Sequence, residues 1–170
     1  MDSEIERILD EVLEREGWPQ YTDHPNDRGG PTKGGITLKT LRQWRQRPVN
    51  RQELQRLEKP EALRILERRY VDSNGIHKIP DAHLKIQVID SAVLSGPVLS
   101  AKDLQKVLKV IADGVIGPKT LAALEARDAA EVHNKLAVAR SLRLVRWTQK
   151  NPDQLVFLNG WMTRTLSFVS

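Results

Sequence analysis

The sequence contains no cysteine among its 170 residues, which excludes disulfide bonds, thiol catalysis and cysteine-ligated metals. Aromatic residues make up only 5% of the chain. No apolar run reaches the roughly 18 residues that a membrane-spanning helix requires. The N-terminal segment, MDSEIERILDEVLEREGW, has no basic start and no apolar stretch, so we expect no cleavable signal peptide. The length suits one compact domain with a substantial core.

Histidine is also scarce. The four histidines, His24, His77, His83 and His133, are scattered, with no pair at helical spacing. Without cysteine partners they do not form a usual zinc ligand set. We therefore expect neither a metal site nor a cofactor.

The basic charge is concentrated near the C-terminus. The whole chain carries 27 Lys and Arg against 22 Asp and Glu, a net charge of +5. Residues 130–170 alone carry six basic and two acidic side chains. Arg140, Arg143, Arg146 and Lys150 form one stripe of an expected helix. Two interpretations stay open: attraction to an anionic partner, or a solvated face around apolar residues; those apolar residues are Leu136, Ala139, Leu142 and Val145.

Hydrophobic periodicity predicts a mainly α chain of about eight helices, with an irregular or β-hairpin insertion at residues 17–37. The first helix should end near Glu16-Gly17, because glycine commonly follows a last helical turn. We predict capping residues at Thr37, at Asn50 with Glu53, and at Ser100 with Asp103. Prolines suit the first turns of two further helices. The remaining helices are expected at 81–94, which is apolar enough to be buried, at 129–150 and at 153–168.

The insertion, within EREGWPQYTDHPNDRGGPTKGGIT at residues 14–37, holds five of the ten glycines and three of the nine prolines. A helix ending in a glutamate, followed by a glycine-rich loop with carboxylates, suits glycoside hydrolysis. That reaction needs one acid to protonate the leaving oxygen and a second carboxylate. Glu16 is the candidate acid, and we expect Trp18 and Tyr21 to form an apolar wall that half-buries it and raises its pKa. A plain surface glutamate is the alternative.

The same loop resembles the signature of glycoside hydrolase family 108, the phage-type N-acetylmuramidases. Glu16-Gly17 matches the start of that signature, although Trp18 replaces its second glycine. The later chain resembles the peptidoglycan-binding region that usually follows in this family, through the segments 90–97, 104–105, 113–124 and 157–166. The remaining signature positions match in order at Asp27, Gly29, Gly30, Thr32, Gly35, Ile36 and Thr37.

The resemblance implies a lysozyme-like single globular domain that hydrolyses the β-1,4 bond between N-acetylmuramic acid and N-acetylglucosamine. It implies that Glu16 is the general acid. We expect a catalytic region at residues 1–85, with its active-site loop at 16–37, and a peptidoglycan-binding-like region at 86–170.

With Glu16 as the candidate acid, the loop also offers candidates for the second carboxylate, for the residue that orients water and for substrate contacts. Asp27, 11 residues later, is the candidate second carboxylate, and Asp23 is its rival. Thr32 is expected to orient the water. Substrate contacts are expected at Tyr21, Asp23, Gly30 and Gly35, since glycine permits close backbone approach to a sugar. Carboxyl groups roughly 6.5–9.5 Å apart would predict inversion, and about 5 Å retention.

The favoured function is thus an endolysin. It would be made in the host cytoplasm, released through a holin-type pore and act as a monomer on the peptidoglycan strand in the periplasm or wall. The C-terminal cations would contact an anionic envelope surface. Three alternatives stay open: a non-catalytic wall-binding module, a lytic transglycosylase using the same glutamate, and a nucleic-acid-binding protein. We disfavour the last because it leaves the glycine loop unexplained.

Overall fold

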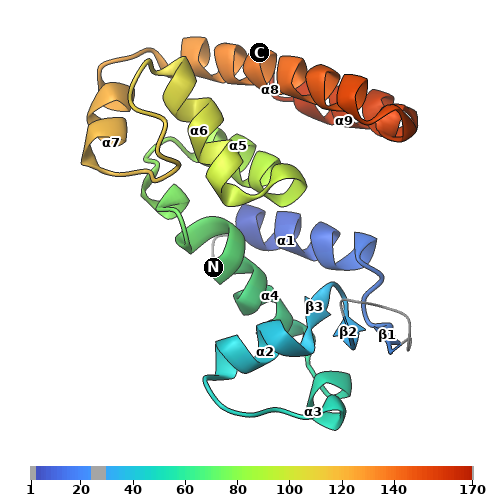
Figure 1. Cartoon of the computed structure of the whole chain (residues 1–170). Helices are drawn as coiled ribbons and strands as arrows, with labels where there is room; N and C mark the ends of the chain where they lie inside the picture. Colours follow the sequence, from blue (N-terminus) through green and yellow to red (C-terminus); the bar gives the residue numbers. More distant parts are fainter. Residues whose placement is uncertain (1–2, 24–29, 170) are drawn as a thin grey trace. The chain divides into compact units, whose positions relative to one another are not determined.

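The structure is a computed structural model of the chain and describes residues 3–23 and 30–169. The chain forms two compact units, the first ending at Arg69 and the second beginning at Tyr70. The described residues are mainly helical, with one small antiparallel sheet, as the sequence predicted (Figure 1). The division by activity expected after residue 85 stays a prediction.

The first unit surrounds the predicted insertion with helices. Its central contact joins α1 and α4, where α1 buries the five apolar residues of its predicted face. The sheet lies between α1 and α2 in the chain, in strand order β1-β2-β3. The elements are α1 (Ser3–Arg15), β1 (Tyr21–Thr22), β2 (Thr32–Lys33), β3 (Ile36–Thr37), α2 (Leu38–Arg45), α3 (Arg51–Gln55) and α4 (Lys59–Glu67).

Two of the predicted helix caps in this unit are confirmed. The Thr37 side chain accepts a hydrogen bond from the Thr40 amide at the start of α2. Asn50 and Glu53 form the reciprocal capping box of α3, with bonds of 3.0 and 3.1 Å. Such caps satisfy amides that the first helical turn leaves without partners, so local sequence fixes where both helices begin.

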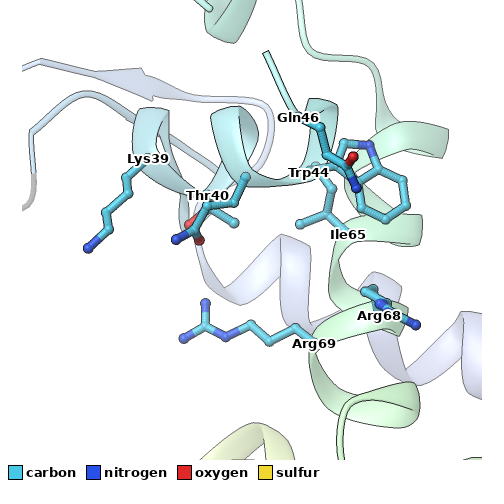
Figure 2. Close-up of a pocket in the computed structure, with 8 residues that line it drawn as sticks. Lys39, Thr40, Trp44, Gln46, Ile65, Arg68 and Arg69 are labelled. Atoms are coloured by element: carbon cyan, nitrogen blue, oxygen red, sulfur yellow. The ribbon is translucent and has the colours of Figure 1, made fainter. Parts of the chain in front are cut away.

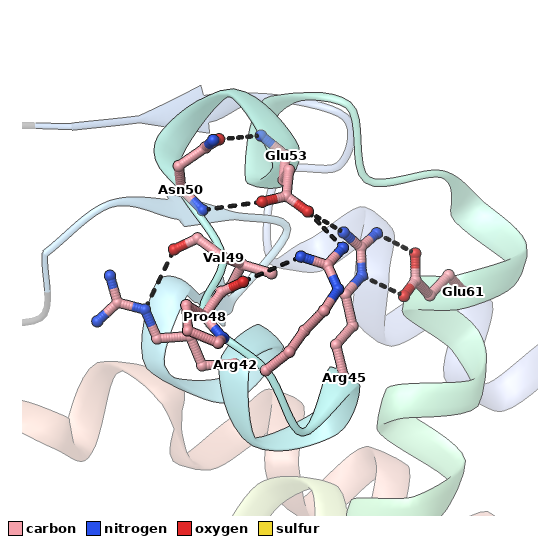
Figure 3. A network of polar contacts seen from close by, with 8 residues as sticks. Arg42, Arg45, Pro48, Val49, Asn50, Glu53 and Glu61 are labelled. Atoms are coloured by element: carbon pink, nitrogen blue, oxygen red, sulfur yellow. Dashed lines mark hydrogen bonds and ion pairs between the residues drawn. The ribbon is translucent and has the colours of Figure 1, made fainter.

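A polar network ties α2, α3 and α4 together (Figure 3). The Arg45 guanidinium donates two hydrogen bonds to the Glu61 carboxylate, at 2.9 and 2.7 Å, and one of 3.1 Å to Glu53. Arg47 donates to the same Glu53 oxygen, and Arg42 Nε donates to the carbonyl oxygen of Val49. A paired guanidinium–carboxylate fork fixes orientation as well as distance. The network therefore fixes the short helices of this unit.

The second unit packs α5 against α6 and α8. The prediction of a buried helix at 81–94 is confirmed by α5, whose buried residues lie on all sides. The boundary between the two units falls within the π-helix η1 (Arg68–Asp72). The later elements, all in the second unit, are η2 (Ile76–Lys78), α5 (Ala82–Ser95), α6 (Pro97–Val107), α7 (Pro118–Glu125), α8 (Ala129–Lys150), η3 (Pro152–Phe157) and α9 (Leu158–Leu166).

Two expectations about this unit are wrong. Helix α6 begins at Pro97, so Ser100 lies inside it and donates a 2.6 Å hydrogen bond to the Val88 carbonyl oxygen instead of capping. The predicted helix at 153–168 is divided into the 3₁₀ helix η3 and the helix α9. Pro97 is favourable at a first helical position, which moves the start of α6 ahead of Ser100.

The predicted basic stripe on α8 is also wrong, because two of its members point inward. Arg140 is 1% exposed and lies 2.6 Å from Asp90 Oδ2. Arg143 donates to Asp103 at 2.5 Å and to Ser95 at 2.8 Å. A charge is buried only when it is paired, and these acids on α5 and α6 supply the pairing.

The apolar face expected on α8 is displaced as a consequence. Leu142 is half exposed, at 50% of its surface. The buried residues of the helix are Val132, Leu136, Ala137, Arg140, Leu144 and Thr148.

The motif DGVIG at residues 113–117, part of a segment that resembles the family's peptidoglycan-binding region, has a structural role in the second unit. The Gln105 side-chain amide donates to Asp113 and to the Val115 carbonyl oxygen, and its oxygen accepts from the Gly114 amide. Asn74 bonds the same turn from the other side, through the Gly114 carbonyl and the Ile116 amide. These residues hold the turn before α7 in place.

None of the helices within residues 3–23 and 30–169 combines the length and hydropathy that crossing a bilayer would require.

Candidate active site

Glu16 directly follows Arg15, the last residue of α1. Its amide bonds the Val12 carbonyl oxygen at 3.0 Å, so it completes the final turn. Gly17 then adopts a left-handed conformation, with φ of +80°. The amides of Gly17 and Trp18 bond the carbonyl oxygens of Glu14 and Leu13, each at 3.0 Å. This pair of bonds is the Schellman arrangement that ends helices at glycine, and it places the Glu16 side chain on a fixed helix end.

The turn between β2 and β3 lies directly against this helix end. A Cβ atom placed on Gly35 would be 2.9 Å from Glu16 Oε2 and 3.1 Å from Glu16 Cγ. A Cβ on Gly34 would be 2.7 Å from Cε3 of Trp18. Both glycines have positive φ, +72° for Gly35 and +52° for Gly34. Here glycine is required twice over, by the backbone conformation and by the closeness of Glu16 and Trp18.

The Glu16 side chain is solvent-exposed, which corrects the expectation of a half-buried acid beside Trp18 and Tyr21. Trp18 packs instead on Gly34 and close to Leu13, and its ring lies 4.9 Å beneath the ammonium of Lys33. The tryptophan thus supports the turn that approaches Glu16. The carboxylate itself faces solvent, where a substrate can reach it.

Tyr21 and Asp23 form a separate pair on the β1 side. The Tyr21 hydroxyl donates a 3.1 Å hydrogen bond to Asp23 Oδ2, and Arg51 Nε donates one of 2.9 Å to the same oxygen. Burial raises the pKa of the Tyr21 phenol, and the Asp23 carboxylate raises it further. Asp23 is therefore already engaged by a cation from α3. Its rival Asp27 lies outside the described residues, as does Gly29.

Three threonines form a row across the small sheet. Thr22 lies opposite Thr32 in β2, and Thr32 lies opposite Thr37 in β3. The hydroxyl oxygens of Thr22 and Thr32 are 3.0 Å apart, while the Thr37 oxygen caps α2. Of this row, Thr32 is the predicted water-orienting residue, and its hydroxyl is held by Thr22.

Gly30, a predicted substrate contact, has φ of +70°, and a Cβ there would meet no atom of the described residues within 4 Å. The positive φ at this position favours glycine, and the missing side chain leaves open space beside the backbone. Gly35 differs, because its space is filled by Glu16. The structure thus brings Glu16 and Gly35 together and joins Tyr21 to Asp23.

Lys33 is a residue of the site that sequence reasoning missed. Its ammonium donates to the carbonyl oxygens of Gln55 and Leu57, at 2.6 and 2.8 Å. It thereby connects β2 with the chain after α3 while lying over the Trp18 ring. Its partners are backbone atoms of residues more than 20 positions away, so no spacing in the sequence could predict these hydrogen bonds.

The profile described as Glycosyl hydrolase 108 matches residues 9–96, which contain Glu16 and the glycine turn. The profile described as Predicted Peptidoglycan domain matches residues 100–166. No curated protein sequence matches the chain.

The solved structure of SagA from Brucella abortus is similar along nearly the whole length. It shares 34% sequence identity and a TM-score of 0.68, covering 99% of this chain and 97% of that one. The similarity confirms the expected lysozyme-like fold. The glycosidase profile includes the helix end and the glycine turn, and the second profile follows it along the chain. The chain therefore belongs to glycosyl hydrolase family 108 and is a glycoside hydrolase that degrades peptidoglycan.

Proposed function

We propose that the chain is an N-acetylmuramidase that hydrolyses the β-1,4 bond between N-acetylmuramic acid and N-acetylglucosamine, with Glu16 as general acid. One observation carries this proposal: an exposed carboxylate stands on a fixed helix end and packs against the backbone of Gly35. A general acid must be held within reach of the leaving oxygen. The Schellman end of α1 and the glycine turn provide that restraint.

The reaction proceeds as a proton transfer with displacement at the anomeric carbon. Protonated Glu16 gives its proton to the glycosidic oxygen as the bond to that carbon breaks. A second carboxylate removes a proton from the attacking water in an inverting reaction, or attacks the carbon itself in a retaining one. We assign that second role to Asp27, because Asp23 is engaged by Arg51 and Tyr21. Thr32 would hold the water.

The test is a product analysis on purified peptidoglycan. A muramidase releases fragments with reducing N-acetylmuramic acid ends, which borohydride reduces and mass spectrometry identifies. A lytic transglycosylase releases anhydro ends instead. A wall-binding module sediments with the polymer and releases nothing. Only the first result supports the proposed reaction.

We also propose that the enzyme acts as an endolysin, crossing the membrane through a holin-type pore and working as a monomer. The resemblance of its signature to phage-type muramidases supports this role. Expression in a bacterial host tests it: lysis should require co-expression of a pore-forming protein or permeabilisation with chloroform. Lysis without either treatment would contradict the need for a pore.

A further inference from the structure

A concave surface lies in the first unit, and Glu16 is not part of its lining. This cationic groove has a volume of about 910 Å³. Figure 2 shows its walls, with α2 on one side and Ile65 of α4 with Arg68 and Arg69 on the other. Its lining residues are Lys39, Thr40, Gln43, Trp44, Gln46, Ile65, Arg68 and Arg69.

The groove carries charge of one sign. Lys39, Arg68 and Arg69 contribute three cations, and no carboxylate belongs to its lining within the described part of the chain. Lys39 reaches in from the α2 wall, and Arg69 from the opposite wall toward the same opening (Figure 2). A concave surface lined by cations focuses a positive potential and attracts anionic ligands. The occupant that this chemistry predicts is therefore an anion.

One wall of the groove is fixed before any ligand binds. Arg45, the residue that follows Trp44 in α2, holds the Glu61 carboxylate of α4 with two hydrogen bonds (Figure 3). Trp44 is half-buried, so part of its ring remains at the groove. The network that joins α2 to α4 thus keeps an aromatic face beside the cations.

The opposite wall is unusual in its backbone. Arg68 and Arg69 are the first two residues of the π-helix η1. π-Helical turns are rare and occur frequently at functional sites. Both arginine side chains are exposed, and guanidinium groups bind carboxylates through paired hydrogen bonds. The wall is suited to carboxylates in particular.

We propose that the cationic groove binds the peptide stems that branch from the glycan strand, through their free carboxylates. This inference rests on the proposed muramidase function, since such stems are carried by its substrate. The sugar rings of the strand supply hydroxyl and acetamido groups, whereas the stems supply the anionic charge. A volume of about 910 Å³ falls within the usual range of ligand sites, roughly 300–1,000 Å³, and Trp44 offers an apolar face for aliphatic side chains.

Direct binding is the first test. Isothermal titration measures the affinity of the intact Glu16→Gln protein for a soluble stem tetrapeptide and for the same peptide with amidated carboxyl groups. We expect the double variant Lys39→Gln/Arg69→Gln, made in that background, to bind the free peptide at least tenfold more weakly. Arg56→Gln, an exposed cation on α3's end outside the groove, is the matched control. Equal affinity for both peptides, or an unchanged affinity in the double variant, would overturn the proposal.

Activity measurements separate the role of the groove from that of the Glu16 site. With active Glu16 restored, Lys39→Gln/Arg69→Gln should slow cleavage of intact peptidoglycan several-fold and leave unchanged the cleavage of strands whose stems an amidase has removed. Equal slowing on both substrates would mean that these residues act on the glycan strand itself and would contradict the inference. Preferential binding of DNA or lipopolysaccharide by the same cations would also contradict it.

The two proposals fail separately. If the wild type cleaves neither substrate, the muramidase function is wrong, whereas peptide titration still reports on the groove. If the wild type cleaves both and the titration shows no carboxylate-dependent binding, only the groove assignment is wrong.

Discussion

The Glu16 carboxylate lies so close to the Gly35 backbone that a Cβ there would stand 2.9 Å from Glu16 Oε2. The side chain of a candidate acid is thus positioned by the absence of a side chain in the facing turn. Gly35 also has φ of +72°, a conformation that costs a residue with a Cβ about 1–2 kcal/mol.

Gly35→Ala should therefore reduce activity more than it reduces stability. The added methyl displaces Glu16, and we expect the rate of peptidoglycan cleavage to fall at least tenfold, with a loss of about 1–2 kcal/mol in the free energy of unfolding. Turbidity assays and urea denaturation measure the two quantities. Gly96→Ala, at φ of +87° with open space around its Cβ position, controls for backbone strain. A Gly35 variant as active as the Gly96 variant would argue against this positioning.

Lys33→Met should loosen the sheet side of the site. The substitution keeps the apolar stem and removes the ammonium that bonds the carbonyl oxygens of Gln55 and Leu57. One of these bonds is exposed and the other part-buried, so we expect their loss to cost about 0.5–1.5 kcal/mol in the free energy of unfolding. Urea denaturation should show that loss, and Trp18 fluorescence should change because its cationic neighbour is gone. Lys39→Met, an exposed lysine of α2, is the stability control, and equal stability of the two variants would count against the bridging role.

Removing one partner of the buried pair of Asp90 and Arg140 should lower the free energy of unfolding strongly, and more than replacing both partners together. Both side chains are at most 2% exposed, and Arg164 contacts the same carboxylate. Burial lowers the pKa of Arg140, and Asp90 partly opposes that shift. Removing one partner of a buried pair costs about 3–5 kcal/mol, so Asp90→Ala should lose that much in urea denaturation.

A matched comparison separates this effect from ordinary surface charge. Lys135 and Glu131 form an exposed pair one turn apart on α8, and Lys135→Gln should change the free energy of unfolding by about 1 kcal/mol at most. Replacing Asp90 and Arg140 together by leucine should restore part of the stability that Asp90→Ala loses. If Asp90→Ala were as mild as Lys135→Gln, the interior pairing would be wrong.

Glu61 predicts how stability depends on pH. Hydrogen bonds from Arg45 lower the pKa of Glu61 below its usual value of 4.5, and the Arg45 charge and Trp44 lower this pKa by smaller amounts. A carboxyl group with a lower pKa in the folded state stabilises the fold fully above the unfolded value. That contribution is lost as the pH falls through the lower, folded pKa.

Urea denaturation between pH 3 and pH 7 checks this sign. Wild type should lose stability below about pH 4.5 more steeply than Glu61→Gln, which has no proton to gain at this position. Glu58→Gln is the control, because Glu58 is exposed and makes no capping hydrogen bond at the start of α4. Parallel profiles for wild type and Glu61→Gln would contradict the role given to the Arg45 pairing.

Local patterns predicted the helix ends well, since their causes lie within a few residues. The apolar spacing of α1, the glycine at its end and the capping box at Asn50 each specify a boundary without the rest of the fold. The prediction of a cap at Ser100 was wrong because two start signals lie close together. The helix begins at Pro97, three residues before Ser100. The position of Glu16 at a helix end was predictable for the same local reason.

Pairings between distant segments could not be predicted from the chain. Arg140 was expected in solvent because arginine is usually exposed, and only α5 reveals its partner Asp90. Asp23 seemed a rival acid until Arg51, 28 residues away, was found bonded to it. The exposure of Glu16 depends on where Trp18 packs, which the glycine turn decides. Site roles that depend on such contacts need the folded structure.

The most direct test of the account replaces Glu16 alone. Wild type, Glu16→Gln and Glu14→Gln, an exposed glutamate on the same helix end, are incubated with purified peptidoglycan while reducing muramic acid ends are counted. We expect the rate to fall roughly 100-fold or more for Glu16→Gln, the usual effect of losing a general acid, and to stay at the wild-type value for Glu14→Gln. Equal rates for wild type and Glu16→Gln would remove Glu16 from the mechanism.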